Sequence, residues 1–465
     1  MGTSGSDAVW GVHGQRGRAG AGRGGRGDGL SDDLWRDRAR HRGHAGGRNG
    51  RTPGVSCDGP GLALVAENVA IRFAVLLAAG ALACSYGDGA ARSDVDPTWG
   101  GALESSTGDA QAWAWDLPRG VDPPPQRAEN PTTAAKVALG RQLFYDPTLS
   151  GNETYACATC HEQALAFTDG MPVSTGSTGE QTSRNAPSLV NSAYASFLTW
   201  SNLVLRDMEA HAIVPLFNDQ PIEMGASFFQ DEIIERLAAQ ERYVVDFAVA
   251  FPERPSPEQI SWTTIVDALS AFQRSLVSFE SPYDRWLDGD ASALTPEARR
   301  GLTLFTSPRL GCSRCHAGRL QSLAFPTRAD ERPAHWSELF RNTGLYNVDG
   351  RYPQANPGIV EFTGDPGDDG KHRIPSLRNV ALTAPYMHDG SIPTLDAVLD
   401  HYAAGGRTLD GMHAGVGADH PNKDALVSGF ELAACDRRDL IAFLLSLTDE
   451  SVLKNPQLSD PAGGP

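Results

Sequence analysis

The residues best suited to chemistry form two C-x-x-C-H segments: Cys157, Cys160 and His161, and Cys312, Cys315 and His316. In such a segment the two cysteines can form thioether bonds to a haem, and the histidine then lies beneath the iron as its axial ligand. The alternative is one zinc ion held by four thiolates from the two C-x-x-C pairs. Because a histidine follows both pairs at the same spacing, the pattern favours two covalently bound haem c groups over zinc.

The sequence around these segments is itself repeated. G-x-x-L-F-x-x-P precedes both, at residues 140–147 and 301–308, and P-S-L-x-N follows both, at 187–191 and 375–379. A repeat with so long a period indicates two copies of one domain and not a solenoid. The sequence therefore predicts an all-α protein with two cytochrome c-like helical domains, each with one covalent haem c, packed around an interdomain interface.

Composition and periodicity divide the 465-residue chain further. A Gly/Arg-rich stretch without apolar periodicity is expected to be disordered, and a Pro/Gly/Asp-rich stretch is expected to be a linker. The predicted segments are 1–84 (disordered upstream segment and signal peptide), 85–127 (linker), 128–286 (N-terminal haem c domain), 287–455 (C-terminal haem c domain) and 456–465 (a poorly ordered tail). Helices are expected at 133–144, 231–247, 257–279 and 436–447, and a further one should begin at Pro296 behind an N-cap at Thr295.

An export signal is expected at the end of the upstream segment. Residues 69–84 combine one arginine with an apolar run that closes on Ala81-Leu82-Ala83, the pattern of a secretory signal and its cleavage site. The run is too short to span a membrane. Cys84 follows the cleavage site directly, so lipidation at Cys84 is an alternative outcome. We expect a periplasmic protein whose only contact with the membrane would be a lipid on Cys84.

The charge of the chain limits the classes of partner. The formal net charge is -17, and the excess of acidic residues lies downstream of residue 64. So acidic a body argues against nucleic acid as a partner, because the phosphate backbone would be repelled. It is compatible with a basic or copper-binding protein, although runs of charge are usually only solvated faces.

A longer segment carries a family resemblance. Residues 374–391, I-P-S-L-R-N-V-A-L-T-A-P-Y-M-H-D-G-S, together with the two haem motifs resemble the bacterial di-haem cytochrome c peroxidase and MauG superfamily over about residues 128–455. Three further segments, at 198–202, 211–225 and 340–347, are most similar to its MbnH branch, which oxidises a tryptophan on a partner protein to kynurenine. The resemblance implies a haem-dependent oxidoreductase in which peroxide brings the two haems to a high-valent state. That state would oxidise the partner by long-range electron transfer.

The same resemblance implies a ligand for the second iron. Tyr402 lies eight residues after Thr394, where peroxidases of the superfamily have a methionine and MauG-like proteins have a tyrosine. A tyrosinate stabilises high-valent iron, whereas a methionine thioether would raise the reduction potential. Met387 and Met412 are rival ligands, and Tyr402 could instead be an ordinary half-buried helix residue.

The first iron is expected to be open to peroxide. The loop 172–183, where peroxidases carry a distal histidine, contains no His, Met or Lys. Glu223 matches the distal glutamate of the superfamily and would serve as its general acid–base. His211 stands where the family often has Gln, so it is either catalytic or a core histidine. Trp200 matches the tryptophan relay between the haems, although a tryptophan among apolar residues is more often core.

The resemblance further implies calcium at the domain interface. The matching positions are Asn185 through its side chain and Thr383 and Pro385 through their carbonyls. Oxygen ligands alone suit that ion.

Two other functions stay open. The chain could be a cytochrome c peroxidase that reduces hydrogen peroxide with electrons from a small cytochrome, or a non-catalytic di-haem electron carrier with both irons capped. Tyr402 in place of methionine argues against the first, and the loop 172–183 argues against the second. The expected partners are hydrogen peroxide and either a secreted protein with the target tryptophan, a copper-binding protein being one candidate, or a small donor cytochrome.

Overall fold

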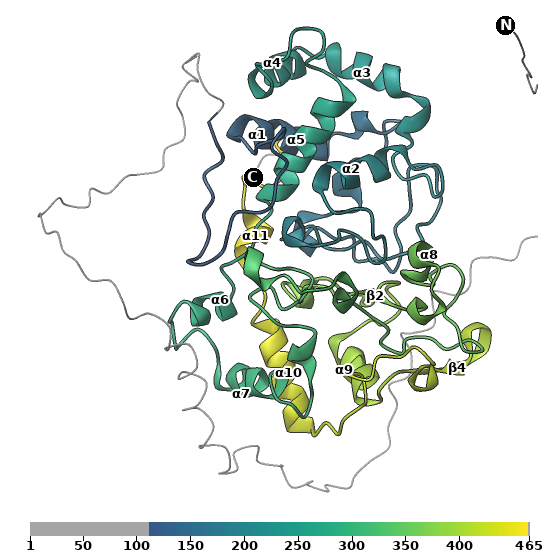
Figure 1. Cartoon of the computed structure of the whole chain (residues 1–465). Coiled ribbons are helices and arrows are strands. Elements are labelled where there is room, and N and C mark those ends of the chain that lie inside the picture. The colour runs from purple at the N-terminus through teal and green to yellow at the C-terminus, as the bar shows by residue number, and fades with distance from the viewer. Residues whose placement is uncertain (1–110, 464–465) are drawn as a thin grey trace, which may run out of the picture. The chain divides into compact units, whose positions relative to one another are not determined.

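The computed structural model describes residues 111–463, and within them short helices are joined by long irregular segments (Figure 1). The predicted upstream segment, the export signal and Cys84 lie outside the described residues. Among residues 111–463, none of the helices has the length and apolar character needed to cross a membrane.

The helices are α1 (Ala134–Tyr145), α2 (Met208–Phe217), α3 (Gln230–Ala238), α4 (Glu241–Ala250), α5 (Trp262–Ser275), α6 (Pro282–Leu287), α7 (Pro296–Phe305), α8 (Val360–Thr363), α9 (Leu395–Ala403), α10 (Ala434–Leu445) and α11 (Glu450–Lys454). The strands β1 (Phe340–Arg341) and β2 (His372–Arg373) pair antiparallel, as do β3 (Thr408–Leu409) and β4 (Gly415–Val416). Helices α1 to α5 form the N-terminal domain and α7 to α10 belong to the C-terminal domain (Figure 1). The prediction of an all-α chain with two cytochrome c-like domains is confirmed.

Capping residues set where the predicted helices begin. The Thr295 side chain accepts a hydrogen bond from the Ala298 amide, and Pro296 takes the first helical position, so α7 starts where predicted. The single helix expected at 231–247 is wrong, because the chain forms α3 and α4 with a break at Gln240, which is extended. The break lets the apolar faces of both helices reach the same core.

Each copy of the repeated G-x-x-L-F sequence lies at a close crossing of helices. A Cβ on Gly140 of α1 would lie 1.9 Å from the Ala268 carbonyl oxygen of α5. A Cβ on Gly301 of α7 would lie 1.9 Å from the Asp439 carbonyl oxygen of α10. Only glycine permits so close an approach of two backbones. The sequence repeat is therefore a repeat of one helix-crossing geometry.

The repeated P-S-L-x-N sequence also has one structure in both domains. The Ser188 hydroxyl donates to the Ala166 carbonyl at 2.6 Å, and the Ser376 hydroxyl donates to the Leu320 carbonyl at 2.7 Å. Asn191 and its counterpart Asn379 have φ values of 59° and 58°. Each P-S-L-x-N segment is thus hydrogen-bonded to the loop that follows the C-x-x-C-H segment of its own domain.

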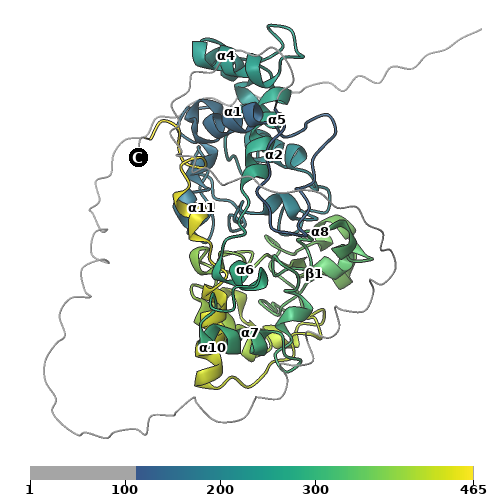
Figure 2. The ribbon, with the colours of Figure 1, turned by 90° about the vertical axis from the view of Figure 1, so that its left-hand side faces the viewer.

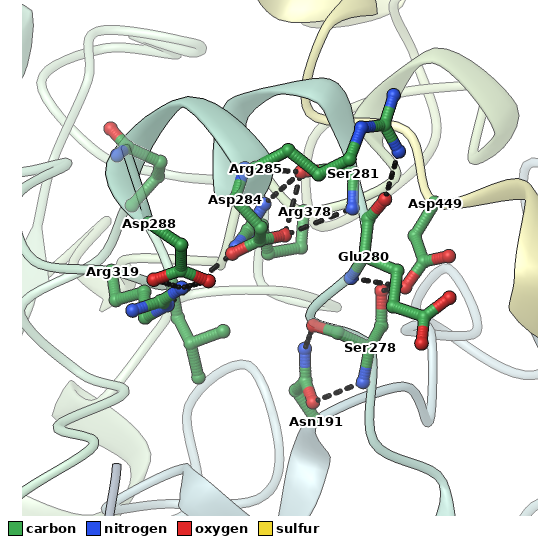
Figure 3. Close-up of polar contacts among 12 residues, drawn as sticks. Asn191, Ser278, Glu280, Ser281, Asp284, Arg285, Asp288, Arg319, Arg378 and Asp449 are labelled. Atoms are coloured by element: carbon green, nitrogen blue, oxygen red, sulfur yellow. Dashed lines mark hydrogen bonds and ion pairs between the residues drawn. The ribbon is translucent and has the colours of Figure 1, made fainter. Parts of the chain in front are cut away.

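A buried polar network joins the two domains (Figure 3). Asn191 and Ser278 exchange two hydrogen bonds, and the Ser278 hydroxyl donates to the Asp449 carboxylate at 2.9 Å. Nearby, the buried Arg378 guanidinium pairs with the Asp284 carboxylate. Removing one partner of so buried an ion pair typically destabilises a protein by about 3–5 kcal/mol, because the other charge is left unpaired. The described residues 111–463 belong to one compact unit, and the predicted domain boundary at 286/287, at the end of α6, stays a prediction.

The end of the chain packs against the N-terminal domain, beside which α11 lies in Figure 2. The Gln163 side chain donates to the Val452 carbonyl at 2.8 Å, and the Tyr145 hydroxyl donates to the Leu458 carbonyl at 2.8 Å. Leu458 is only 7% exposed. The expectation of a poorly ordered tail from residue 456 is therefore wrong at Leu458, because this apolar side chain finds a core far away in the sequence.

The described part of the predicted linker, residues 111–127, is also attached to the domains. The Asp122 amide donates to the Thr327 carbonyl at 3.0 Å, and the Tyr194 hydroxyl donates to the Asp122 carbonyl at 2.8 Å. Trp113 packs against the N-terminal core. Hydrogen bonds and packing therefore hold residues 111–127 against the folded domains, so this segment is not a free linker.

Candidate active site: cavities around the C-x-x-C-H segments

The described residues enclose a cavity beside the first C-x-x-C-H segment. Cys157, Cys160 and His161 all line it. The His161 amide donates to the Cys157 carbonyl at 3.1 Å, which turns the histidine back toward the cysteines. Its Nδ1 lies 2.8 Å from the Phe167 carbonyl oxygen. Because a carbonyl can only accept, Nδ1 carries the hydrogen and the lone pair of Nε2 is left to bind a metal.

A second cavity has the same arrangement beside the other segment. It is lined by Cys312, Cys315 and His316, and the His316 amide donates to the Cys312 carbonyl at 2.9 Å. His316 Nδ1 lies 3.1 Å from the Gln321 carbonyl oxygen, which again leaves Nε2 as the ligand atom. Burial lowers the pKa of His316 to about 4, so the ring is neutral, as a metal ligand must be.

This geometry excludes the alternative of one zinc ion held by all four thiolates. Each pair of cysteines lines its own cavity, so the four thiolates do not meet. Among residues 111–463, no cluster of three or more His, Cys, Asp or Glu side chains could hold a metal ion.

Helix α2 places a second histidine at the first cavity. The Asp207 carboxylate caps α2 by accepting from the Ala210 amide, and Ala212 and Leu216 bury one face of the helix in the core. His211, on the adjoining face, lines the cavity. Burial, and then the nearby positive charges, lower its pKa to about 4, so His211 is neutral near pH 7.

Glu223 reaches the same cavity from the segment after α2. The loop 172–183 holds this segment in place, because the Ser177 amide donates to the Glu223 carbonyl at 2.8 Å. Gly176 in the same loop is required, since a Cβ there would lie 1.9 Å from the Ile222 carbonyl oxygen. The Glu223 carboxyl group makes no hydrogen bond to any described residue, and burial raises its pKa. It is therefore a partly buried acid without a partner among the described residues, at a cavity.

The sequence analysis did not single out some residues of the first cavity. Gln273 of α5 and Met224 also line it, both at least nine-tenths buried. A signal for Gln273 existed, because it is a polar residue one helical turn after the buried Leu269. The loop 172–183 contributes Ser174, Thr175, Gly176 and Thr182, none of which is a usual haem ligand.

Tyr402 projects from α9 into the second cavity. Thr394 caps α9 by accepting from the Ala397 amide, which fixes the register that brings Tyr402 to the wall shared with Cys312 and Cys315. Burial and the two nearby cysteines raise the pKa of Tyr402 above its usual range. Its hydroxyl group makes no hydrogen bond to any described residue and is available to a ligand in the cavity.

The structure separates the two rival methionines. Met412 is 90% exposed, so the alternative that Met412 binds the second iron is wrong. Met387 does line the second cavity, next to His388 in a turn with φ 74°. Ligation by Tyr402 stays a prediction, with Met387 as its rival.

A short segment of chain separates the two cavities. Leu189 lines the first cavity, whereas its neighbours Ser188 and Val190 line the second. The Trp200 indole N–H donates to the Asn185 carbonyl at the start of this segment, at 2.8 Å. Trp200 itself lines the second cavity, so it lies against the wall between the two sites.

Arg373 is a site residue that the sequence analysis missed. Its guanidinium is buried, lines the second cavity and has no carboxylate partner among the described residues. It lies 5.9 Å from the Trp200 ring, and its Nε donates to the Thr199 carbonyl at 2.9 Å. Burial lowers its pKa to about 10, so it stays charged near pH 7. Its charge also lowers the pKa of His211 in the other cavity, so Arg373 acts on both sites.

Comparisons with known proteins agree with this geometry. Residues 134–292 match the family model described as di-haem cytochrome c peroxidase. The methylamine utilization protein MauG of Methylorubrum extorquens is 34% identical over 84% of this chain and 98% of its own length. The cytochrome-c peroxidase IdrP1 of Denitromonas iodatirespirans is 35% identical over 77% of this chain and 93% of its own length. The chain belongs to the di-haem cytochrome c peroxidase and MauG family.

A solved structure supports the same family at higher identity. A MauG-like protein associated with microbial copper homeostasis is 47% identical, with a TM-score of 0.72, over 75% of this chain and 99% of that protein. The resemblance stated from the sequence motifs is therefore confirmed. As a member of this family, the protein is a haem-dependent oxidoreductase with two covalently bound haem c groups.

The residues present fit haem c in both cavities. Each cavity offers two thiols and one imidazole whose Nε2 is free, which is the donor set that haem c requires. A buried cation is costly unless an anion neutralises it. Arg373, unpaired with any described carboxylate, is suited to the carboxylate groups that a haem carries.

Proposed function

We propose that this protein uses hydrogen peroxide to oxidise a tryptophan side chain on a partner protein. The observation that carries the proposal is the contrast between the cavities. The first is lined by Glu223 and His211 as well as His161, and the second is lined by Tyr402 as well as Cys312, Cys315 and His316. A site open to peroxide and a site closed by an oxygen ligand suit an oxidant made at one haem and used from the other. The 47% identity to a MauG-like protein supports this branch of the family.

In the first cavity, side chains of the protein would accept and donate the protons of the reaction. Bound haem c supplies the iron that takes up the oxidising equivalents of peroxide. Cleavage of the O–O bond requires a proton to leave one oxygen and reach the other. Glu223 would accept and return this proton, because its carboxyl faces the cavity without another partner. His211 is neutral near pH 7 and would position the peroxide or a water molecule as a hydrogen-bond partner.

In the second cavity, the chain would exclude the substrate from the iron. If His316 and Tyr402 both held the haem, no coordination position would remain for a substrate. Oxidation of a macromolecular partner would then proceed by electron transfer through the protein. Trp200, against the wall between the cavities and beside the charged Arg373, is proposed as the relay between the haems.

The proposed partner is a secreted protein that carries an accessible tryptophan. A copper-site protein is one candidate, because the MauG-like protein at 47% identity is associated with microbial copper homeostasis. The acidic body favours a basic docking surface, and such docking weakens as salt rises. Covalent haem and the apolar run at 69–84 support a periplasmic location as part of the proposal.

The test is to mix the purified holoprotein, hydrogen peroxide and the product of a neighbouring gene, and to weigh that product by mass spectrometry. We expect a gain of oxygen confined to one tryptophan, which peptide mapping would locate, and no gain without peroxide. Rapid peroxide-dependent oxidation of a small reduced cytochrome, with the candidate protein unmodified, would favour the peroxidase alternative.

Calcium between the domains is a further part of the proposal. Asn185, Thr383 and Pro385 all line the second cavity. The side-chain nitrogen of Asn185 donates to the Met171 carbonyl at 2.7 Å, which leaves the side-chain oxygen of Asn185 available. The carbonyls of Thr383 and Pro385 accept no hydrogen bond from any described residue. The three oxygens suit a hard cation whose remaining ligands are water.

Removal of calcium is expected to slow partner oxidation while both haems stay attached, because their thioether bonds do not depend on the ion. Metal analysis of the purified protein, before and after a chelator, would measure the calcium content. Restored activity on adding calcium but not magnesium would support the site, since magnesium demands shorter bonds. A protein without calcium, or with full activity in excess chelator, would remove these three residues from the site.

A further inference from the structure

Aromatic side chains lead from the second cavity toward the protein surface. Tyr352 lines the cavity, and the Tyr346 ring lies edge-on to it with a centroid separation of 5.6 Å. The next ring is that of half-buried His413, whose centroid lies 5.4 Å from that of Tyr346. The residue before it, Met412, is 90% exposed. Rings in contact thus link the haem-binding cavity to a solvent-exposed turn.

Tyr346 differs from Tyr352 in its hydrogen-bond partner. The Tyr346 hydroxyl donates to the Asp389 carboxylate at 2.6 Å. The Tyr352 hydroxyl donates to the amide oxygen of Asn342 at 3.1 Å. A phenol that loses an electron becomes a strong acid, so its oxidation is much easier when a base can take the proton. A carboxylate is such a base, and an amide oxygen is not.

We propose that Tyr346 is a redox relay that passes electrons from a docked protein to the second haem site, with Asp389 as its proton acceptor. The inference rests on the proposed function, since it needs an oxidised second haem and a macromolecular donor. Tyr346 gives one electron to the second site and its phenolic proton to Asp389, which makes a neutral tyrosyl radical. The partner's tryptophan then supplies one electron, and the proton returns from Asp389. Two such passages deliver the two electrons that reduce one hydrogen peroxide to two water molecules. The tryptophan, oxidised by two electrons, takes up one oxygen from water and releases the two protons that the peroxide requires.

The surroundings of Tyr346 are consistent with a neutral radical. The side chain is 9% exposed, which protects a radical from water and small reductants. The Arg407 guanidinium lies 4.7 Å from the ring centroid and would disfavour a positive charge on the ring. Because the proton moves to Asp389, the ring carries no net charge after oxidation. Tyr346 also lies in the F-R-N-T-G-L-Y-N segment at 340–347, to which the proposed function assigns no other role.

A matched control exists in the N-terminal domain. The Tyr243 hydroxyl donates to the Asp146 carboxylate at 2.5 Å, and the Arg242 guanidinium lies 4.6 Å from the Tyr243 ring centroid. Tyr243 therefore has the same kinds of partner as Tyr346, a carboxylate and a guanidinium. It is, however, buried in the N-terminal core and lines neither haem cavity. It separates the effect of position from the effect of a tyrosine–carboxylate pair.

The experiment compares the parent, Tyr346→Phe and Tyr243→Phe holoproteins after mixing with peroxide. Freeze-quench electron paramagnetic resonance with ring-deuterated tyrosine should show a narrowed tyrosyl signal in the parent and in Tyr243→Phe, and none in Tyr346→Phe. Oxidation of the partner's tryptophan should slow at least about tenfold in Tyr346→Phe alone. The first reaction with peroxide should stay unchanged, because it occurs at the other haem.

Asp389→Asn supplies a second variant that keeps the tyrosine. It should lower the tyrosyl signal and slow partner oxidation, because the proton has no acceptor. A tyrosyl signal and oxidation rate in Tyr346→Phe equal to those of the parent would overturn the inference. Failure of the parent to modify any partner would overturn the proposed function instead, and the tyrosyl signal would still report on Tyr346.

Discussion

Replacing Glu223 with glutamine is expected to slow the reaction with hydrogen peroxide by roughly 10²- to 10⁴-fold, the usual contribution of a positioned general acid–base. Glutamine keeps the size of the side chain but cannot accept a proton. The Glu223 carboxyl faces the first cavity, makes no hydrogen bond to any described residue and belongs to a segment held by the loop 172–183. Loss of the Glu223 carboxyl group should therefore slow the reaction with peroxide and leave the fold intact. Stopped-flow absorbance of the haem after mixing with peroxide measures this rate.

The pH dependence provides a second sign of the same role. Burial raises the pKa of Glu223, so the carboxylate that accepts the proton is lost as pH falls through a value above that of an ordinary glutamate. The parent rate should fall on the acid side at that pH, and Glu223→Gln should lack this dependence. Glu232→Gln is the control, because Glu232 lies exposed on α3 and its ion pair with Arg236 is a surface contact. Equal rates in Glu223→Gln and the control would contradict a catalytic role.

Tyr402→Phe is expected to change the second haem and to slow partner oxidation by at least about tenfold, or roughly 1.4 kcal/mol in the barrier. The phenyl ring fills the same space, but it removes the only oxygen that α9 directs into the cavity near His316. Electron paramagnetic resonance should show an altered signal for the second haem and an unchanged signal for the first. The rate of the first reaction with peroxide should stay close to that of the parent.

Two further substitutions separate ligation from packing. Tyr402→Met should raise the reduction potential of the second haem, because a thioether favours reduced iron more than an anionic oxygen does. Met387→Leu should leave the spectrum unchanged if Tyr402 is the ligand, and it should alter the spectrum if Met387 is. A Tyr402→Phe signal identical to that of the parent would show that Tyr402 only packs against the haem.

Much of the site could be predicted from local sequence. The C-x-x-C-H segments work through atoms within five consecutive residues, so their chemistry does not depend on distant parts of the fold. The repeated glycines Gly140 and Gly301 marked the helix crossings for a similar reason, since a backbone contact that excludes a side chain leaves a glycine in the sequence. The register from Thr394 to Tyr402 is that of one capped helix, and the structure places Tyr402 in the cavity as this register requires.

Only the tertiary structure decided which distant side chains meet. Arg373 is a site residue because β2 brings its charge beside Trp200 and into the lining of the second cavity, and no local pattern distinguishes it from a surface arginine. Leu458 is ordered because a core formed by α1 and its neighbours receives it. Met412 is excluded as a ligand by its exposure, although its residue type suits iron as well as that of Met387. Local propensity determines where a helix begins, whereas burial and pairing depend on residues hundreds of positions apart.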